Sequence, residues 1–485
     1  MITQLRLKRF KSFADATLEL GPFTLLVGTN ASGKSNLRDA FRLLHGIGRG
    51  YTLAEIIGEK RSEGEKIWGG IRGGIRGLAF QDAETFALEV SLEIEPASVY
   101  QPQGSRGLRD KVLNVHSSSS TKSPNKVQAQ ASHFFTKRST PQMMKLIYRV
   151  EVVSGAQEQT PRVLREWLRE ADNDIPIFEA FPASELEDGE SFTPTPATLL
   201  VTLSELAEPG SIVDENFRLT LPDHQPVLSQ CIEHNNLSDI AQNMVRTARI
   251  VLDDFKNMRF LDPNPDAMRQ PATPGQTILS DRGENLAAVL YSIVNDPHQK
   301  ETFIEWLQEL TPMDATDFEF PSDPAGRVLL TLVEAHGQRI SAYSASDGTL
   351  RFLALLAALL GPQPARFHFF EELESGIHPT RLRLLLSLIE QRVSRNDIQV
   401  VASTHSPQLL LMLEPDTIEH VSLCYRLENQ PDTRIKKLLD LPNARHLVET
   451  QDVARLHESG WLEDAVEFME DAASATQPVA GEHSR

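Results

Sequence analysis

The chain of 485 residues is too long for one ordinary hydrophobic core, so we expect two or three domains; 40% hydrophobic and 24% charged residues are typical of a soluble globular protein. The net charge of −19 argues against a surface generally coated with nucleic acid, but it does not exclude a local basic site. No apolar run approaches the ~20 residues of a membrane helix, and Cys231 and Cys424 fit no metal-ligand spacing, so we expect a cytoplasmic protein with no membrane contact.

The first predicted element that carries chemistry is an apolar strand at residues 23–27, which a glycine-rich loop and a helix follow. Leu37, Phe41 and Leu44 recur at helical spacing after the loop. The loop fits the pattern G-x-x-x-x-G-K-[ST] of a phosphate-binding P-loop, and it consists of Gly28, Thr29, Asn30, Ala31, Ser32, Gly33, Lys34 and Ser35. A strand before the loop and a helix after it are the context that this motif needs, so we expect these residues to bind a nucleotide.

The residue types of this loop suit the phosphate groups of ATP. Glycines let the backbone curl so that its N–H groups point inward, and the helix N-terminus adds the positive end of its dipole. We expect Lys34 to reach the outer phosphates and the Ser35 hydroxyl to bind Mg²⁺. Residues 1–95, which end in an alternating strand pattern at 86–94, are therefore predicted to form the N-terminal half of an ATPase head.

Residues 96–145 are expected to be a flexible basic insertion, because Ser, Gln, Pro and Lys dominate their composition. Residues 101–149 hold nine basic residues and one acidic residue, whereas residues 170–190 hold eight acidic residues and no basic one. Two interpretations of the basic stretch stay open, a nucleic-acid-contacting arm and an ordinary solvated loop. Residues 146–260 follow as a middle inserted region whose task the sequence does not indicate.

From residue 261 to 440, apolar strands alternate with helices, which predicts a parallel sheet with functional loops at the carboxyl ends of its strands. Glu371 and Glu372 directly follow the apolar residues 367–370. A P-loop ATPase needs carboxylates at such a place, so we expect Glu371 to bind Mg²⁺ and Glu372 to act as the general base toward water.

Two further polar groups stand at element ends of this C-terminal half. His405 follows the apolar strand at 399–402 and is expected to sense the γ-phosphate. Ser346 and Gly348 precede an apolar helix, where backbone N–H groups offer an anion site. Taken alone, the latter pair is explained better as an ordinary helix cap.

In this order the motifs resemble the ABC-type ATPase heads of the RecF/SMC class, and specifically the predicted AAA-family ATPases with such a head. The resemblance covers about residues 1–95 and 260–425. It rests on an opening motif at 9–13, the Walker A residues 28–35, a signature-like 346–349, the Walker B residues 367–372, a D-loop at 374–379 and a switch-histidine motif at 403–406. It implies an α/β P-loop NTPase head, a mixed sheet with flanking helices that an inserted α+β middle domain splits, and it leaves residues 441–485 as a C-terminal helical piece and disordered tail.

In that class two heads enclose two ATP molecules, and the signature of one head faces the P-loop of the other. The resemblance therefore implies ATP hydrolysis with ATP and Mg²⁺ as cofactors, in a homodimer or higher oligomer where Ser346 and Gly348 act in trans. It also implies action on double-stranded DNA or on a separately encoded nuclease or effector, in DNA maintenance or anti-phage defence. Departures from the family pattern are Glu371 in place of an aspartate, Ser-Asp-Gly-Thr as the signature, and His378 in place of the D-loop aspartate.

An ATP-binding scaffold or sensor with negligible hydrolysis is the alternative. The same residues would then close a dimer, and Glu371 would hold Mg²⁺ in a stable complex. A transporter subunit is disfavoured, because a whole domain separates the P-loop from the signature-like residues.

Overall fold

The computed structural model describes residues 1–95, 143–154, 160–173, 176–183, 198–203, 217–230, 239–310, 315–395, 398–427, 430–441 and 444–445. The larger parts of the basic insertion expected at 96–145 and of the C-terminal piece expected at 441–485 lie outside the described residues. Among the helices of the described part, none combines the length and the apolar character needed to cross a membrane.

The larger of two main sheets is antiparallel and has eight strands in the order β11-β10-β9-β8-β7-β6-β1-β2. From Leu88 to Ile94 of β6, buried and partly exposed residues alternate, as the sequence pattern predicts for a sheet with one face on the core. Strands β7 to β11, from the middle region predicted at 146–260, continue the sheet that β1, β2 and β6 begin. The domain boundaries expected from the sequence stay a prediction. The strands are β1 (Ile2–Phe10), β2 (Phe13–Glu19), β6 (Thr85–Ile94), β7 (Met144–Val153), β8 (Arg162–Glu170), β9 (Pro176–Pro182), β10 (Thr198–Leu203) and β11 (Phe217–Pro222).

The second main sheet has six strands in the order β12-β16-β17-β3-β18-β19, and every pair except the last is parallel. Strands β3, β16 and β17 are buried at every residue, which explains their continuous apolar sequences. Because their carboxyl ends meet at one edge, the loops after these strands come together there. The strands are β12 (Met258–Leu261), β16 (Phe367–Phe370), β17 (Gln399–Thr404), β3 (Phe23–Val27), β18 (Val421–Tyr425) and β19 (Arg434–Lys437).

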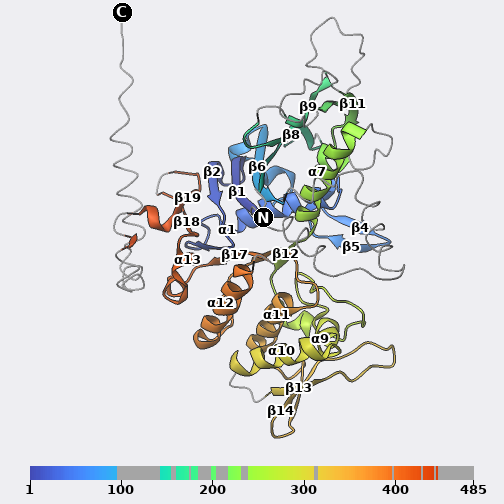
Figure 1. Ribbon diagram of the computed structural model, residues 1–485, viewed down its shortest axis with the longest axis vertical. Helices are drawn as coiled ribbons and strands as arrows, with labels where there is room; N and C mark the ends of the chain where they lie inside the picture. Colours follow the sequence, from blue (N-terminus) through green and yellow to red (C-terminus); the bar gives the residue numbers. More distant parts are fainter. Residues whose placement is uncertain are drawn as a thin grey trace, which may run out of the picture.

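A hydrophobic core covers each face of the parallel sheet. On one face, α1 (Lys34–Gly48) lies between the two sheets, and the ring of its Phe41 is 5.0 Å from that of Phe367. Helix α7 (Asp239–Lys256) packs on the same core. The other face carries a second core, built with α9 (Leu286–Val294), α11 (Asp347–Leu360) and α12 (Pro379–Ser394), which Figure 1 shows on the side away from the eight-stranded sheet.

Smaller elements complete the described chain. A three-stranded sheet of β13 (Ala315–Glu319), β14 (Thr331–Glu334) and β15 (Arg339–Ser341) lies beside α10 (Pro297–Leu310) at the bottom of Figure 1. The remaining elements are α2 (Leu53–Ile57), β4 (Lys60–Ser62), β5 (Glu65–Trp68), η1 (Ile75–Gly77), η2 (Phe80–Asp82), α6 (Val227–Gln230), α8 (Pro265–Met268), η4 (Pro407–Met412), α13 (Pro415–Ile418) and η5 (Leu438–Asp440). Mixed sheets with helices on both faces of the parallel one confirm the predicted α/β class.

Candidate functional site

The P-loop connects the carboxyl end of β3 to the first turn of α1. Its curl needs left-handed backbone at Ala31, with φ of 64°, and at Gly33, with φ of 103°. The loop also lies against the β18–β19 hairpin: a Cβ on Gly28 would be 2.2 Å from the carbonyl oxygen of Cys424, and one on Gly33 would be 2.6 Å from Thr433 Cγ2. Both glycines of the motif are therefore required by close contact, as well as by conformation at Gly33.

Polar groups inside the loop suit a phosphate. Lys34 Nζ donates hydrogen bonds to the carbonyl oxygens of Gly28 at 2.5 Å and Thr29 at 2.8 Å, which places the ammonium group within the curl. Burial lowers the pKa of Lys34 from its ordinary value, and neighbouring carboxylates partly offset this. Ser32 Oγ is buried without a hydrogen-bond partner in the described part of the chain. A phosphate oxygen would satisfy that hydroxyl, so the loop fits a nucleotide.

The two predicted carboxylates lie at the carboxyl end of β16. Glu371 pairs with two arginines: its Oε2 is 2.9 Å from Arg38 Nη1, and its Oε1 is 3.8 Å from Arg72 Nη2. Glu372 has a positive φ of 48°, its backbone N–H donates to Ser403 Oγ at 3.1 Å, and its side chain is exposed. A non-glycine residue in this conformation is uncommon, and such residues concentrate at functional sites.

Ser35 and Glu371 have the right chemistry for Mg²⁺, because both offer oxygen atoms, the ligands that this ion prefers. No cluster of three or more His, Cys, Asp and Glu side chains in the described residues could hold a metal ion by itself. A bound Mg²⁺ would thus take its other ligands from phosphate and water, which is its usual coordination in nucleotide sites.

His405 follows β17, the strand between β16 and β3. Its Nδ1 lies 3.4 Å from Glu374 Oε1, and the same oxygen accepts hydrogen bonds from the His405 backbone N–H at 3.1 Å and from the Thr404 hydroxyl at 2.8 Å. The other carboxylate oxygen of Glu374 is buried and has no partner in the described chain. The sequence placed Glu374 only within the D-loop and gave no sign that it holds His405.

Ser346 and Gly348 lie at the start of α11, and the Ser346 hydroxyl accepts from Thr349 N–H at 3.1 Å, as a helix cap does. Gly348 lies against the D-loop, because a Cβ there would be 2.4 Å from the carbonyl oxygen of Gly376. Arg351, one turn along, donates to Ser375 Oγ at 2.9 Å. The contacts recorded for Ser346 and Gly348 within the described residues are thus with their own helix and the D-loop rather than with residues 28–35.

The opening motif, residues 9–13, contacts the first turns of α1. Lys11 Nζ lies 2.5 Å from Asp39 Oδ2 and donates to the carbonyl oxygen of Arg72 at 2.7 Å. Ser12 Oγ accepts from Asn36 at 2.8 Å and lies 2.8 Å from the Thr433 hydroxyl. The β1–β2 turn therefore connects the first turns of α1 to the β18–β19 hairpin and to the glycine-rich segment 69–77, which we call the strap.

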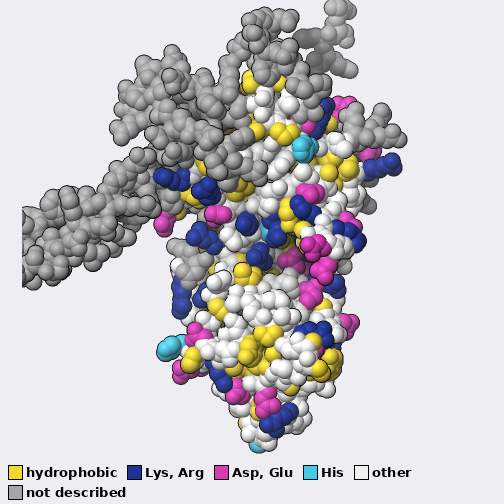
Figure 2. Space-filling model, turned by 90° about the vertical axis from the view of Figure 1, so that its right-hand side faces the viewer, with side chains coloured by type: hydrophobic (Ala, Val, Ile, Leu, Met, Phe, Trp, Pro, Cys, Tyr) yellow, Lys and Arg dark blue, Asp and Glu magenta, His cyan; other side chains and the backbone are white. Residues whose placement is uncertain are grey.

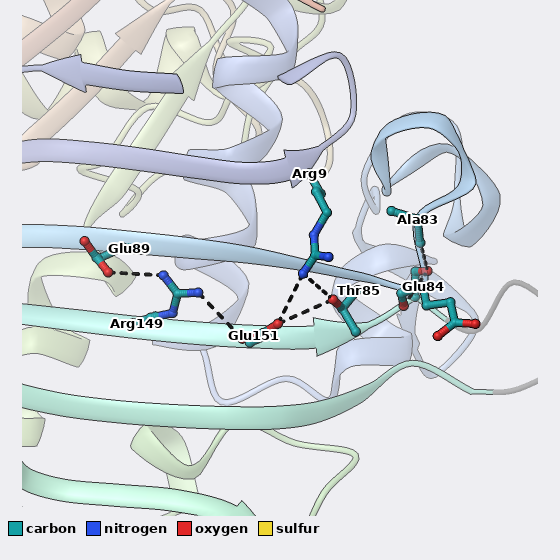
Figure 3. A network of polar contacts seen from close by, with 8 residues as sticks. Arg9, Ala83, Glu84, Thr85, Glu89, Arg149 and Glu151 are labelled. Carbon is teal, nitrogen blue, oxygen red and sulfur yellow. Dashed lines mark hydrogen bonds and ion pairs between the residues drawn. The ribbon is translucent and has the colours of Figure 1, made fainter. Parts of the chain in front are cut away.

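Arg9 of the same motif belongs to a separate polar network on the exposed face of the larger sheet (Figure 3). Its guanidinium donates to Thr85 Oγ1 at 2.7 Å and lies 3.5 Å from Glu151, while Arg149 bridges Glu151 and Glu89. These cross-strand contacts join β1, β6 and β7, so Arg9 connects the β1 end of the opening motif to the neighbouring strands of the sheet.

Charges on the described surface are mixed in sign. Figure 2 shows Lys and Arg side chains next to Asp and Glu across the middle of one face. The most asymmetric part of the sequence, the basic stretch from 101 to 149, lies outside the described residues up to 142. The structure brings the P-loop, the two carboxylates and His405 to one edge of the parallel sheet; their roles stay predictions.

Comparison with known proteins gives one family match. The sequence model of the family described as "AAA domain, putative AbiEii toxin, Type IV TA system" matches residues 147–411. This range covers more than half of the chain and includes Ser346, Glu371, Glu372 and His405, but it begins after the P-loop. No curated protein matches the sequence.

Solved structures of SMC heads are among those that match the fold. One, described as the SmcHead bound to the C-winged helix domain of ScpA, has a TM-score of 0.42 and 13% identity over 90% of this chain and 97% of that chain. The SMC head domain from Thermotoga maritima has a TM-score of 0.37 and 12% identity over 90% and 98%. The Smc head with an extended coiled coil, bound to the C-terminal domain of ScpA from Pyrococcus furiosus, has a TM-score of 0.41 and 11% identity over 93% and 98%.

Proposed function

Because the chain belongs to the AAA-domain family described as "putative AbiEii toxin, Type IV TA system", we propose that it binds ATP at Gly28–Ser35 and hydrolyses it to ADP and phosphate. The observation that carries the proposal is the meeting of three strand ends at one edge of the parallel sheet. They bring Lys34, the Glu371–Glu372 pair and His405 to that edge. Transfer of a phosphoryl group to water needs such a combination of cation, metal-side carboxylate, base and phosphate sensor.

Each residue has a role that its surroundings support. Lys34 would exchange its hydrogen bonds to loop carbonyls for the outer phosphates of ATP. Ser35 and Glu371 would hold Mg²⁺, which when bound neutralises developing charge on the phosphates. Glu372, exposed at the strand end, would take a proton from the attacking water, and His405 would donate to the γ-phosphate from a ring that Glu374 orients.

Dimerisation of two heads is part of the proposal. Ser346, which is exposed, and Gly348 contact their own helix and D-loop instead of the P-loop of the same chain. Their backbone N–H groups thus suit the ATP that a second copy holds, in a homodimer or larger oligomer. We propose that this closure gates an action on double-stranded DNA or on a nuclease or effector partner, in DNA maintenance or anti-phage defence. The family description, which names a toxin of a toxin–antitoxin system, is consistent with action on a partner.

An ATP sensor with negligible hydrolysis is the second candidate, and the arginine pair on Glu371 favours it. With Arg38 at 2.9 Å and Arg72 at 3.8 Å, Glu371 has cationic partners already. A carboxylate that must exchange partners before Mg²⁺ binds would slow the reaction.

The Glu372→Gln variant separates the two candidates. Wild-type protein is expected to release phosphate from ATP, and the variant should bind ATP as tightly but lose about 100-fold or more of that rate. Glu301→Gln, on the exposed side of α10, is the matched control and should keep the full rate. A negligible wild-type rate that Glu372→Gln leaves unchanged would support the sensor. If the wild-type protein does not bind ATP at all, both candidates are excluded.

A further inference from the structure

Glu371 lies between two guanidinium groups that come from different parts of the chain. Arg38, on α1, is 14% exposed and approaches Oε2 at 2.9 Å. Arg72, on the glycine-rich strap 69–77, is 52% exposed and approaches Oε1 at 3.8 Å. Both carboxylate oxygens therefore face a positive charge, and Glu371 itself is only 17% exposed.

The strap holds Arg72 in this place by several contacts. The Ile71 backbone N–H donates to the carbonyl oxygen of Ile57 at 3.0 Å, and Gly70 lies so close to Gly58 that a Cβ would be 1.5 Å from its carbonyl oxygen. Beyond this anchor, Gly73 and Gly74 have positive φ of 86° and 57°. The strap is therefore anchored to residues 57–58 just before Arg72, and two glycines with positive φ follow it.

Arg72 has other partners besides Glu371. Its Nη2 donates to the Ser35 carbonyl oxygen at 2.5 Å, and its Nε lies 3.4 Å from Asp39 Oδ2. Its backbone carbonyl oxygen accepts from Lys11 at 2.7 Å. Arg72 can thus leave Glu371 and remain paired, whereas a carboxylate that binds Mg²⁺ must give up a guanidinium partner.

We propose that Arg38 and Arg72 compete with Mg²⁺ for Glu371 and so set the Mg²⁺ concentration at which the chain binds ATP. The inference rests on the proposed nucleotide site and names the residues that set its metal requirement. Guanidinium groups and a divalent cation need the same carboxylate oxygens, and like charges a few ångströms apart repel strongly where water is partly excluded. Removal of either arginine frees one carboxylate oxygen and lowers that repulsion.

The test measures binding of a fluorescent ATP analogue to the full chain as Mg²⁺ is titrated. In Arg38→Met and Arg72→Met, the Mg²⁺ concentration at half-maximal binding should fall about three- to tenfold relative to wild type. Arg76→Met is the matched control, because it removes an exposed arginine from the same strap, and its midpoint should equal that of wild type. Electron paramagnetic resonance of Mn²⁺ in place of Mg²⁺ gives a second measure of metal affinity without turnover.

A double substitution tests the route through Glu371. In a Glu371→Gln background, Arg38→Met should no longer shift the Mg²⁺ midpoint, because the contested carboxylate is gone. Midpoints that stay unchanged or rise in both arginine variants would overturn the inference while leaving the proposed function intact. Wild-type protein that binds no nucleotide at any Mg²⁺ concentration would instead refute the proposed function itself.

Discussion

Lys11 and Asp39 form an ion pair across the start of α1, with Lys11 Nζ 2.5 Å from Asp39 Oδ2 and side chains that are 7% and 1% exposed. The pair joins the β1–β2 turn to the helix that begins at the P-loop. Buried charges are stable only while they are paired, so this contact makes the position of the P-loop helix depend on the opening motif.

Breaking that pair should destabilise the fold. In Lys11→Met, the cationic partner left to Asp39 within the described residues is the more distant Arg72, 3.4 Å away, so we expect a loss of about 3 kcal/mol in the free energy of unfolding. Urea unfolding of the variant and the wild type measures this difference in stability. Arg61→Met, which breaks a pair with Glu59 that is 57% and 42% exposed, should cost less than about 1 kcal/mol. Equal losses in the two variants would show that burial does not strengthen the Lys11 contact.

Glu374→Gln should slow turnover without weakening ATP binding. The substitution removes the charge that faces His405 Nδ1 at 3.4 Å, so we expect kcat to fall at least about tenfold, a barrier increase of about 1.4 kcal/mol, with KM little changed. Steady-state phosphate release gives both constants. Glu390→Gln is the control, because Glu390 likewise accepts from a backbone N–H at 2.9 Å and a threonine hydroxyl at 2.8 Å but lies outside the site. A rise in KM alone would assign Glu374 to binding.

The strand ends of the candidate site were predictable because each is marked locally. Continuous apolar residues at 23–27 and 367–370 predict buried strands, and the polar residues directly after them can only lie at one sheet edge. The glycine spacing of the P-loop reflects close contacts at Gly28 and Gly33 and the positive φ of Gly33.

The contacts of Arg72 and Glu374 were not predictable, because they depend on how separate segments meet. Arg72 reaches Glu371 from a strap in which Gly-Gly-Ile-Arg occurs twice, a repeat that does not indicate what the arginine contacts. Glu374, in the loop after β16, reaches His405, which follows the neighbouring strand β17. The pairing of β6 with β7 in the larger sheet was not predictable either. Residues 96–142 separate the two strands in the sequence, and no local pattern indicates which strands pair.

Gly28→Ala should weaken ATP binding. Its Cβ would be 2.2 Å from the Cys424 carbonyl oxygen, a backbone atom that moves only if β18 moves, so we expect the P-loop to shift and ATP affinity to fall more than about tenfold. Calorimetric titration with ATP measures this. Gly77→Ala, where a Cβ would meet nothing within 4 Å, should bind normally. Normal affinity in Gly28→Ala would mean that the loop relaxes without cost to the phosphate site.

Deletion of residues 101–140 tests the proposed link to DNA. The segment carries most of the basic residues counted between 101 and 149, so its removal should weaken DNA binding and flatten its dependence on salt, while ATP binding stays unchanged. Fluorescence anisotropy at several salt concentrations measures both effects. Removal of the acidic residues 184–190 is the control and should not reduce DNA affinity. If the protein without residues 101–140 keeps an unchanged, salt-sensitive affinity for DNA, the hypothesis of a DNA-contacting arm is refuted.

Glu166, buried on β8, should make stability depend on pH. Its Oε1 accepts from the Tyr148 hydroxyl at 2.9 Å and from Leu228 N–H at 2.8 Å, and its Oε2 accepts from Val227 N–H at 2.6 Å. Burial nevertheless outweighs these bonds and raises the pKa of Glu166 from 4.5 to about 7.

The folded protein therefore retains a proton that the unfolded chain releases between these two pKa values. The stability from this group is complete below the lower value and is lost as pH rises through the upper one, a change of up to about 3 kcal/mol. Glu166→Gln should lose some stability at every pH, because its amide nitrogen cannot accept from Val227, but it should lack this decline. Urea unfolding at pH 5 and pH 8 compares the variant with wild type and with the exposed-site control Glu301→Gln. Parallel declines in all three proteins would show that Glu166 ionises alike in the folded and unfolded states.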